Sequence, residues 1–159
     1  MKPKQIITRI ISGGQTGVDR AAFDFAIENK IEIGGFVPKN RLAEDGRISD
    51  KYPNLQETMS DNPAERTGQN VKNSDATLIL SHGDARGGSL LTKEFAEKYQ
   101  KPFLHIDFLL STTGEAQGKI RKWLKSINCR NLNIAGSRAS EDAGIYEKTL
   151  ELLEGVFKK

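Results

Sequence analysis

The pattern of hydrophobic and polar positions alternates along the chain between two periodicities. Short apolar, β-branched runs predict strands at residues 5–12, 31–37, 75–81, 103–108 and 131–136. Apolar positions at helical spacing predict helices at residues 17–30, 62–74, 89–101, 114–128 and 140–159. This order is typical of a mostly parallel sheet with helices on both faces. The sequence therefore predicts a doubly wound α/β fold of about five strands.

Local signals refine two of these helices and single out one loop. Asn62 is a good N-cap, Pro63 suits the first helical position, and Glu65 is placed to close a capping box. Ser140 is a plausible cap for the last helix. The polar segment at residues 38–60 is longer than a plain connector, and loops of that length are usually functional or disordered.

Composition limits the class of protein. A chain of 159 residues favours a single domain covering 1–159, and its net charge of +3 permits an anionic ligand without indicating a surface that coats nucleic acid. No run approaches the length of a membrane span, and the apolar run near Met1 is too short for a signal peptide, so we expect a cytoplasmic protein. One cysteine and two distant histidines give no metal-site spacing, and no metal site is predicted.

Three predicted strands end in turns that contain glycine. The segments "SGGQTG", "SHGDARGGS" and "AGSRAS" stand at the ends of the strands at 5–12, 75–81 and 131–136. Carboxyl ends of parallel strands meet at one edge of a sheet, where doubly wound folds bind their ligands. We therefore expect the three turns to form one ligand site.

The first turn has two interpretations that the sequence leaves open. Its glycines allow close approach of the backbone, and the helix that follows aims N–H groups at the turn, as in phosphate sites. A tight structural corner would use the same glycines. The spacing matches neither of the two common phosphate-loop motifs. The candidate ligand-binding residues of this turn are Gly13, Gly14, Gln15, Thr16 and Gly17.

Further candidates lie beside these turns, and a structural role is open for each. Asp19 and Arg20 begin the first helix, where they can orient a ligand and contact a phosphate. Arg66 and Asn70 are four residues apart and so share a helix face. Lys39 and Arg41, in the long loop, suit anion capture. The second and third turns add Gly87, Gly88, Ser89, Thr92 and Gly136.

Of the two histidines, His82 is the better functional candidate. It follows a strand at the expected site edge, whereas His105 lies inside an apolar strand and is more typical of a core histidine. Whether His82 and the 38–60 segment take part in binding stays open.

Several blocks together resemble the family of putative molybdenum carrier proteins. They read "ISGGQTGVDRAAFDFA", "PKNRLAEDGRISDKYP", "ERTGQNVKNSDATLIL", "GGSLLT" and "LNIAGSRASEDAGIYE", and they cover most of the chain. The resemblance implies a Rossmann-like fold and binding of molybdenum cofactor (molybdopterin) or a related phosphorylated ligand. It also implies self-association into dimers or tetramers. A carrier of this kind needs no catalysis, and neither a membrane nor a nucleic acid is expected as a partner.

The chain also resembles, more distantly, the Lonely Guy phosphoribohydrolases, which release a base from a nucleoside monophosphate. Those enzymes have an Arg on the helix before a strand and then a PGGxGTxxE turn. Here Arg66, Gly87 and Gly88 match, but the turn reads "RGGSLLTKE". The resemblance implies an alternative, an enzyme cleaving an N-glycosidic bond. In that alternative Arg66 would hold the phosphate, and Glu94 or Asp19 would stabilise positive charge on the sugar.

Overall fold

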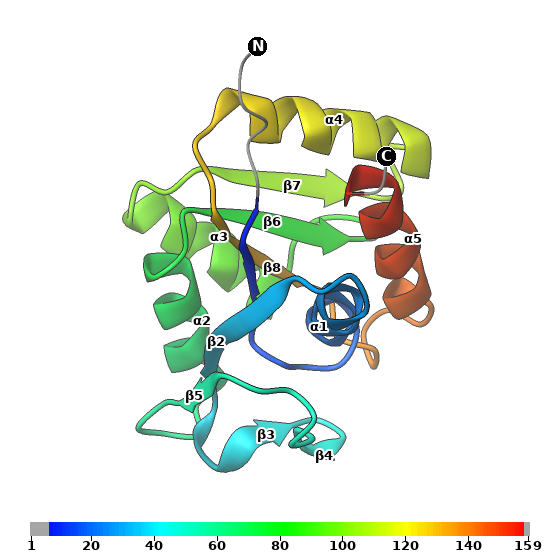
Figure 1. The fold of residues 1–159 in the computed structure, drawn as a ribbon. Coiled ribbons are helices and arrows are strands. Elements are labelled where there is room, and N and C mark those ends of the chain that lie inside the picture. Colours follow the sequence, from blue (N-terminus) through cyan, green and yellow to red (C-terminus); the bar gives the residue numbers. More distant parts are fainter. Residues whose placement is uncertain (1–6, 158–159) are drawn as a thin grey trace.

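The computed structural model describes residues 7–157 and has a six-stranded parallel sheet at its centre (Figure 1). The strand order is β5-β2-β1-β8-β6-β7, and every pair in this sheet is parallel. The α/β doubly wound fold expected from the sequence is thereby confirmed. The strands are β1 (Arg9–Ile11), β2 (Glu32–Val37), β5 (Leu55–Glu57), β6 (Ala76–Ser81), β7 (Phe103–Asp107) and β8 (Asn131–Gly136).

Helices cover both faces of the sheet. One group consists of α2 packed on α3, and the other of α5 packed between α1 and α4 (Figure 1). Their bounds are α1 (Val18–Glu28), α2 (Pro63–Lys72), α3 (Gly88–Lys98), α4 (Thr113–Ser126) and α5 (Ile145–Phe157). The two layers bury the apolar strand positions, and the inner strand β6, between β8 and β7, is buried along its whole length. Such burial on both faces is what parallel sheets require.

The predicted strands and helices are present, with shifts at their ends. The first strand is shorter than predicted, and residues 5 and 6 lie outside the described part of the chain. Asn62 caps α2 as predicted, because its Oδ1 accepts a hydrogen bond from the Ala64 N–H. The predicted capping box is wrong. The Glu65 carboxylate instead accepts hydrogen bonds from the Met59 N–H and the Ser60 hydroxyl.

The last helix starts later than its sequence suggests. It begins at Ile145, so Ser140 is not its cap. Residues 137–144 form a turn instead, and the Ser140 hydroxyl donates to the Glu44 carboxylate, 2.6 Å away. Across residues 7–157 no helix combines the length and the apolar character needed to cross a bilayer.

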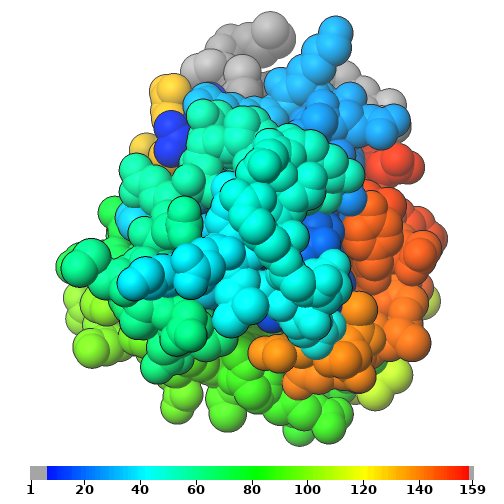
Figure 2. Space-filling view, turned by 90° about the horizontal axis from the view of Figure 1, so that it is seen from below, coloured from blue at the N-terminus to red at the C-terminus, as the bar shows by residue number. Residues whose placement is uncertain are grey.

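The 38–60 segment is an ordered part of the fold. It contains a short 3₁₀ turn, Lys39–Arg41, a hairpin of β3 (Leu42–Ala43) and β4 (Gly46–Arg47), and the edge strand β5. Figure 2 shows this segment, in cyan, lying against the orange turn that follows β8. Ile48 and Tyr52 from it are buried in the core. Sequence reasoning missed β5 and the hairpin because both strands of the hairpin and β5 are only two or three residues long.

Candidate functional site

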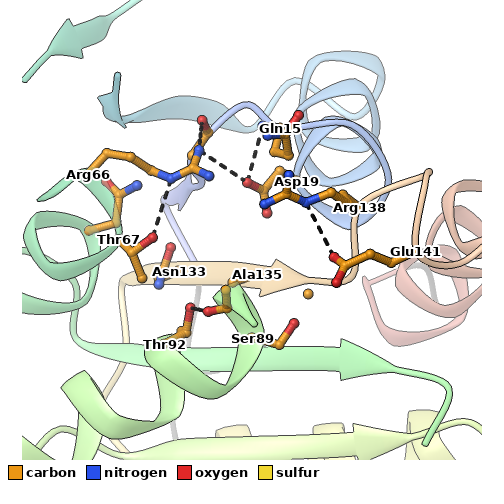
Figure 3. Close-up of a pocket in the computed structure, with 14 residues that line it drawn as sticks. Gln15, Asp19, Arg66, Thr67, Ser89, Thr92, Asn133, Ala135, Arg138 and Glu141 are labelled. Atoms are coloured by element: carbon orange, nitrogen blue, oxygen red, sulfur yellow. Dashed lines mark hydrogen bonds and ion pairs between the residues drawn. The ribbon is translucent and has the colours of Figure 1, made fainter. Parts of the chain in front are cut away.

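A pocket lies at the carboxyl edge of the sheet, where the turns after β1, β6 and β8 meet (Figure 3). Its cavity volume is about 40 Å³. Since one buried water needs roughly 10–15 Å³, this is room for about three waters or one anionic group, and a larger ligand would extend through the mouth. The lining residues are Gly13, Gln15, Asp19, Arg66, Thr67, Asn70, Gly88, Ser89, Thr92, Asn133, Ala135, Gly136, Arg138 and Glu141.

One side of the pocket is a buried pair of opposite charges. Arg66 Nη1 donates to the Gly13 carbonyl over 2.6 Å and lies 3.8 Å from Asp19 Oδ2. Only 9% of the Arg66 side chain and 10% of the Asp19 side chain are exposed. Burial raises the pKa of Asp19, and the nearby Arg66 charge opposes that rise. A buried guanidinium keeps its charge, so this pair is a polar and costly feature to place at a sheet edge.

Three N–H groups of the first glycine turn donate to partners within the protein. The Gln15 N–H donates to Asp19 Oδ2 over 3.2 Å, and the Thr16 N–H donates to the Gln15 side-chain oxygen over 3.0 Å. The Val18 N–H donates to the Ser137 carbonyl. These three donors are therefore engaged within the protein, and the turn has a structural role: it positions Asp19 and Gln15.

The turn before α3 is different. Gly87 is the N-cap of α3, has a φ of 54°, and makes no side-chain cap. Ser89 is 5% exposed and lines the pocket, and within residues 7–157 its hydroxyl has no hydrogen-bond partner. No hydrogen bond donated by the Gly88 N–H occurs in the same part of the chain. A free N–H, a free hydroxyl and the positive end of a helix together favour an anion here.

The mouth of the pocket carries a second set of charges. Arg138 Nε lies 3.3 Å from Glu141 Oε1, and Arg138 Nη1 lies 4.0 Å from Glu44 Oε1. The Glu44 carboxylate also accepts from the Thr16 hydroxyl and from the Ser140 N–H and hydroxyl, and these bonds lower its pKa. Glu44 thus joins the 38–60 segment to the turns after β1 and β8.

Comparison with known proteins identifies the family. The model of the Circularly permutated YpsA SLOG family matches residues 10–157. The chain belongs to this family. A crystal structure described as a putative molybdenum carrier protein from Syntrophus aciditrophicus SB is 52% identical, with a TM-score of 0.95 over 98% of each chain. The resemblance to molybdenum carriers seen in the sequence is thereby confirmed. No match among curated proteins was found.

In this SLOG family member, many predicted site residues do lie together. Nine of the sequence candidates line the pocket: Gly13, Gln15, Asp19, Arg66, Asn70, Gly88, Ser89, Thr92 and Gly136. The Gly136 backbone lies close to the Leu80 carbonyl and Val18, so a Cβ there has no room. Asn70 faces inward, but its side-chain amide exchanges two hydrogen bonds with the Phe36 backbone and so fastens α2 to β2.

Other candidates lie outside the pocket lining, and several have structural partners. Arg20 donates to the Gly14 carbonyl and to Asp45, and Arg41 donates to carbonyl groups of Ile48, Ser49 and Tyr52. Glu94 is exposed on α3. Those absent from the lining are Gly14, Thr16, Gly17, Arg20, Lys39, Arg41, Gly87 and Glu94.

Neither histidine lines the pocket, but His82 lies near one of its turns. His82 Nδ1 is 2.8 Å from Asp142 Oδ2, which ties the end of β6 to the turn after β8. His105 Nε2 is 2.7 Å from the Ser81 hydroxyl, and burial lowers the pKa of His105. Burial also raises the pKa of Cys129 to about 12. Within the described residues no cluster of metal-ligating side chains occurs.

Sequence reasoning missed five lining residues: Thr67, Asn133, Ala135, Arg138 and Glu141. Asn133 carried a usable signal, because it is the polar residue inside the apolar run "NLNIAG". Arg138 and Glu141 stand in "AGSRASED", which was interpreted as a turn and a helix start. Their role becomes visible only when that segment is seen as a turn that bends over the pocket.

Proposed function

We propose that this protein binds a phosphorylated small molecule of the molybdopterin type and acts as its carrier. The phosphate would occupy the small cavity at the start of α3, and the rest of the ligand would lie over the mouth. Two findings support this ligand class, namely the naming of the Syntrophus relative as a putative molybdenum carrier and the polar chemistry of the pocket.

The observation that carries this proposal is the free polar group beside a buried cation. Ser89 and Gly88 line the same small cavity as Arg66, whose guanidinium is buried. Gly88 is exposed and Ser89 is largely buried, so donors without partners among the described residues stand at the start of α3 beside a buried cation, where an acceptor is favoured. A phosphate oxygen is an acceptor of the right charge, and helix N-termini commonly bind such groups.

The hydrogen bonds of the first turn make the α3 turn, rather than "SGGQTG", the proposed contact for the phosphate. The N–H groups at Gln15, Thr16 and Val18 are engaged within the protein. The α3 turn therefore supports an anion better than "SGGQTG" does. In this proposal Asp19 and Gln15 form polar walls of the cavity, and Arg138 lies at its mouth, where it would contact the ligand.

Mass spectrometry of the protein purified without denaturation tests the proposal. We expect a retained phosphorylated compound, and calorimetry should show affinity for molybdopterin or for a nucleoside monophosphate such as adenosine 5′-monophosphate. Absence of a retained compound together with absence of heat from molybdopterin, molybdate and nucleotides would contradict the proposal.

The hydrolase alternative keeps Arg66 and Asp19 in the pocket but leaves Glu94 exposed to solvent, so no observation favours it. Incubation with nucleoside monophosphates and chromatography for free base distinguishes the two. Base release that is lost in Arg66→Ala would replace the carrier proposal with the enzyme. Self-association into dimers or tetramers stays a prediction, which light scattering on the purified chain tests.

A further inference from the structure

A carboxylate of the protein itself lies at the place where the proposed phosphate would bind. Glu141 lines the pocket, and its Oε1 is 3.3 Å from Arg138 Nε. A Cβ built on Gly87, the N-cap of α3, would lie 3.5 Å from Glu141 Oε2. One Glu141 oxygen therefore faces an arginine and the other faces the start of a helix, which are the two partners an anion seeks.

We propose that Glu141 is an internal competitor that occupies the anion subsite until a ligand phosphate displaces it. This inference rests on the proposed function, because it assumes an anionic ligand in the same pocket. It makes Glu141 the residue that sets the affinity of the site.

The partial exposure of Glu141 allows this exchange. Its side chain is 42% exposed, whereas the pair behind it, Arg66 and Asp19, is about nine-tenths buried. A half-exposed ion pair contributes little to stability, roughly 0–1 kcal/mol, so moving Glu141 into solvent is a small cost. A ligand that brings its own negative charge replaces the lost contact with Arg138.

A second carboxylate lies near Arg138. The Arg138 Nη1 is 4.0 Å from Glu44, which is itself held by hydrogen bonds from Thr16 and Ser140. Glu44 therefore keeps one negative charge near the guanidinium when Glu141 moves away, and the departure of Glu141 frees the Nε side of Arg138 for another anion.

The helix start offers no competing cap. Gly87 has no side chain, and α3 makes no side-chain cap hydrogen bond. The free Ser89 hydroxyl is an additional observation that points to a ligand there. Glu141 thus lies near an uncapped helix N-terminus without accepting a hydrogen bond from its N–H groups, and a phosphate with more acceptor oxygens can satisfy them.

The test compares adenosine 5′-monophosphate and inorganic phosphate binding, by calorimetry, to the wild-type chain and to Glu141→Gln. The Glu141 carboxylate has the same sign of charge as the ligand phosphate and lies beside the helix N-terminus and Arg138 that the phosphate would contact. Removing its charge should therefore tighten binding by about fivefold. Glu141→Ala should give the same direction, because it also removes the carboxylate. Glu147→Gln is the matched control. It removes one negative charge from the exposed first turn of α5 without touching the pocket, and should leave affinity almost unchanged.

The outcomes distinguish failure of the Glu141 inference from failure of the proposed function. Unchanged or weaker binding in both Glu141 variants, with binding in the wild type, overturns the inference and leaves the proposed function standing. An equal gain in Glu147→Gln also overturns it, because the gain would then come from net charge alone. Absence of binding in every variant, with molybdopterin included as a third probe, overturns the proposed function and the inference together.

Discussion

The turns before α1 and before α3 are alike in sequence but differ in how closely the protein packs around them. Both are rich in glycine and both join a strand of the central sheet to a helix. In the first, N–H groups donate to Asp19, to Gln15 and to Ser137. In the second, the Ser89 N–H donates to the Arg86 carbonyl, whereas the Gly88 N–H and the Ser89 hydroxyl make no hydrogen bond within residues 7–157.

The glycines differ in the same way. A Cβ on Gly17 would lie 2.4 Å from the Ser137 carbonyl oxygen, whereas a Cβ on Gly88 would meet nothing within 4 Å. In the first turn the glycine serves close packing, and in the second it leaves space. The Ser137 carbonyl closes the first turn at Gly17, whereas the open surroundings of Gly88 leave room for a ligand at the second turn.

We expect the largest effect on stability from a substitution that disrupts the first turn and not the second. Gly17→Ala places a methyl group against the Ser137 carbonyl at a φ of 79°, so we expect a loss of about 3 kcal/mol in the free energy of unfolding. Gly88→Ala should change it by less than about 0.5 kcal/mol, because its surroundings are open. Urea unfolding of both variants measures this, and equal losses would contradict the contrast between the turns.

The hydroxyl groups of Thr16 and Ser89 allow a second comparison of the two turns, with a smaller expected effect on stability. The Thr16 hydroxyl accepts from the Ala139 N–H and donates to Glu44, so Thr16→Ala should lower the free energy of unfolding by about 1 kcal/mol. The Ser89 hydroxyl has no partner within residues 7–157, so Ser89→Ala should leave stability unchanged and weaken adenosine 5′-monophosphate binding by about fivefold. Stability loss in Ser89→Ala, with affinity retained, would assign that hydroxyl to the fold.

The smallest effect concerns the carboxylate that closes the first turn. Burial raises the pKa of Asp19 above its ordinary value of 3.8, so the folded state holds that proton more tightly than the unfolded state. The stabilising contribution of the protonated form is full below that value and is lost as pH rises through the folded pKa. Asp19→Asn, which carries no ionisable group at this position, should remove this loss of stability with rising pH.

The measurement is a difference between two stability curves. The free energy of unfolding of Asp19→Asn relative to the wild type should increase as pH rises above about 3.8, toward neutrality. Subtracting the curves cancels the other carboxylates, such as Glu44 and Asp75, whose lowered pKa values favour the fold at higher pH. A flat or falling difference would show that the Arg66 charge outweighs burial at Asp19.

The sequence predicted the sheet and the shared edge because both depend on local periodicity. Long apolar runs such as residues 75–81 and 131–136 could be assigned, and parallel pairing then placed their ends together. β5 was missed because it is three residues long and lies in a polar segment. Its pairing with β2 depends on contacts far along the chain, which no local pattern reports.

The site was predicted in part for the same reason. Ser89 and Arg66 stand in recognisable motifs, whereas Glu141 falls in the segment predicted as the start of the last helix, at residues 140–159. Its place in the pocket follows from the delayed start of α5 at Ile145, which leaves residues 137–144 free to bend toward α3. Hydrogen bonding from Glu44, almost a hundred residues away, fixes that bend.

The position of β8 has a consequence for synthesis of the chain. β8 is the last strand along the described sequence, yet it lies between β1 and β6 in the middle of the sheet. During synthesis the strands β1, β2 and β5 and the strands β6 and β7 precede β8, so we expect the two parts of the sheet to expose facing edges until residues 131–136 join them. We expect the pocket to form late for the same reason, because β8 contributes to its lining and is followed by the turn with Arg138 and Glu141.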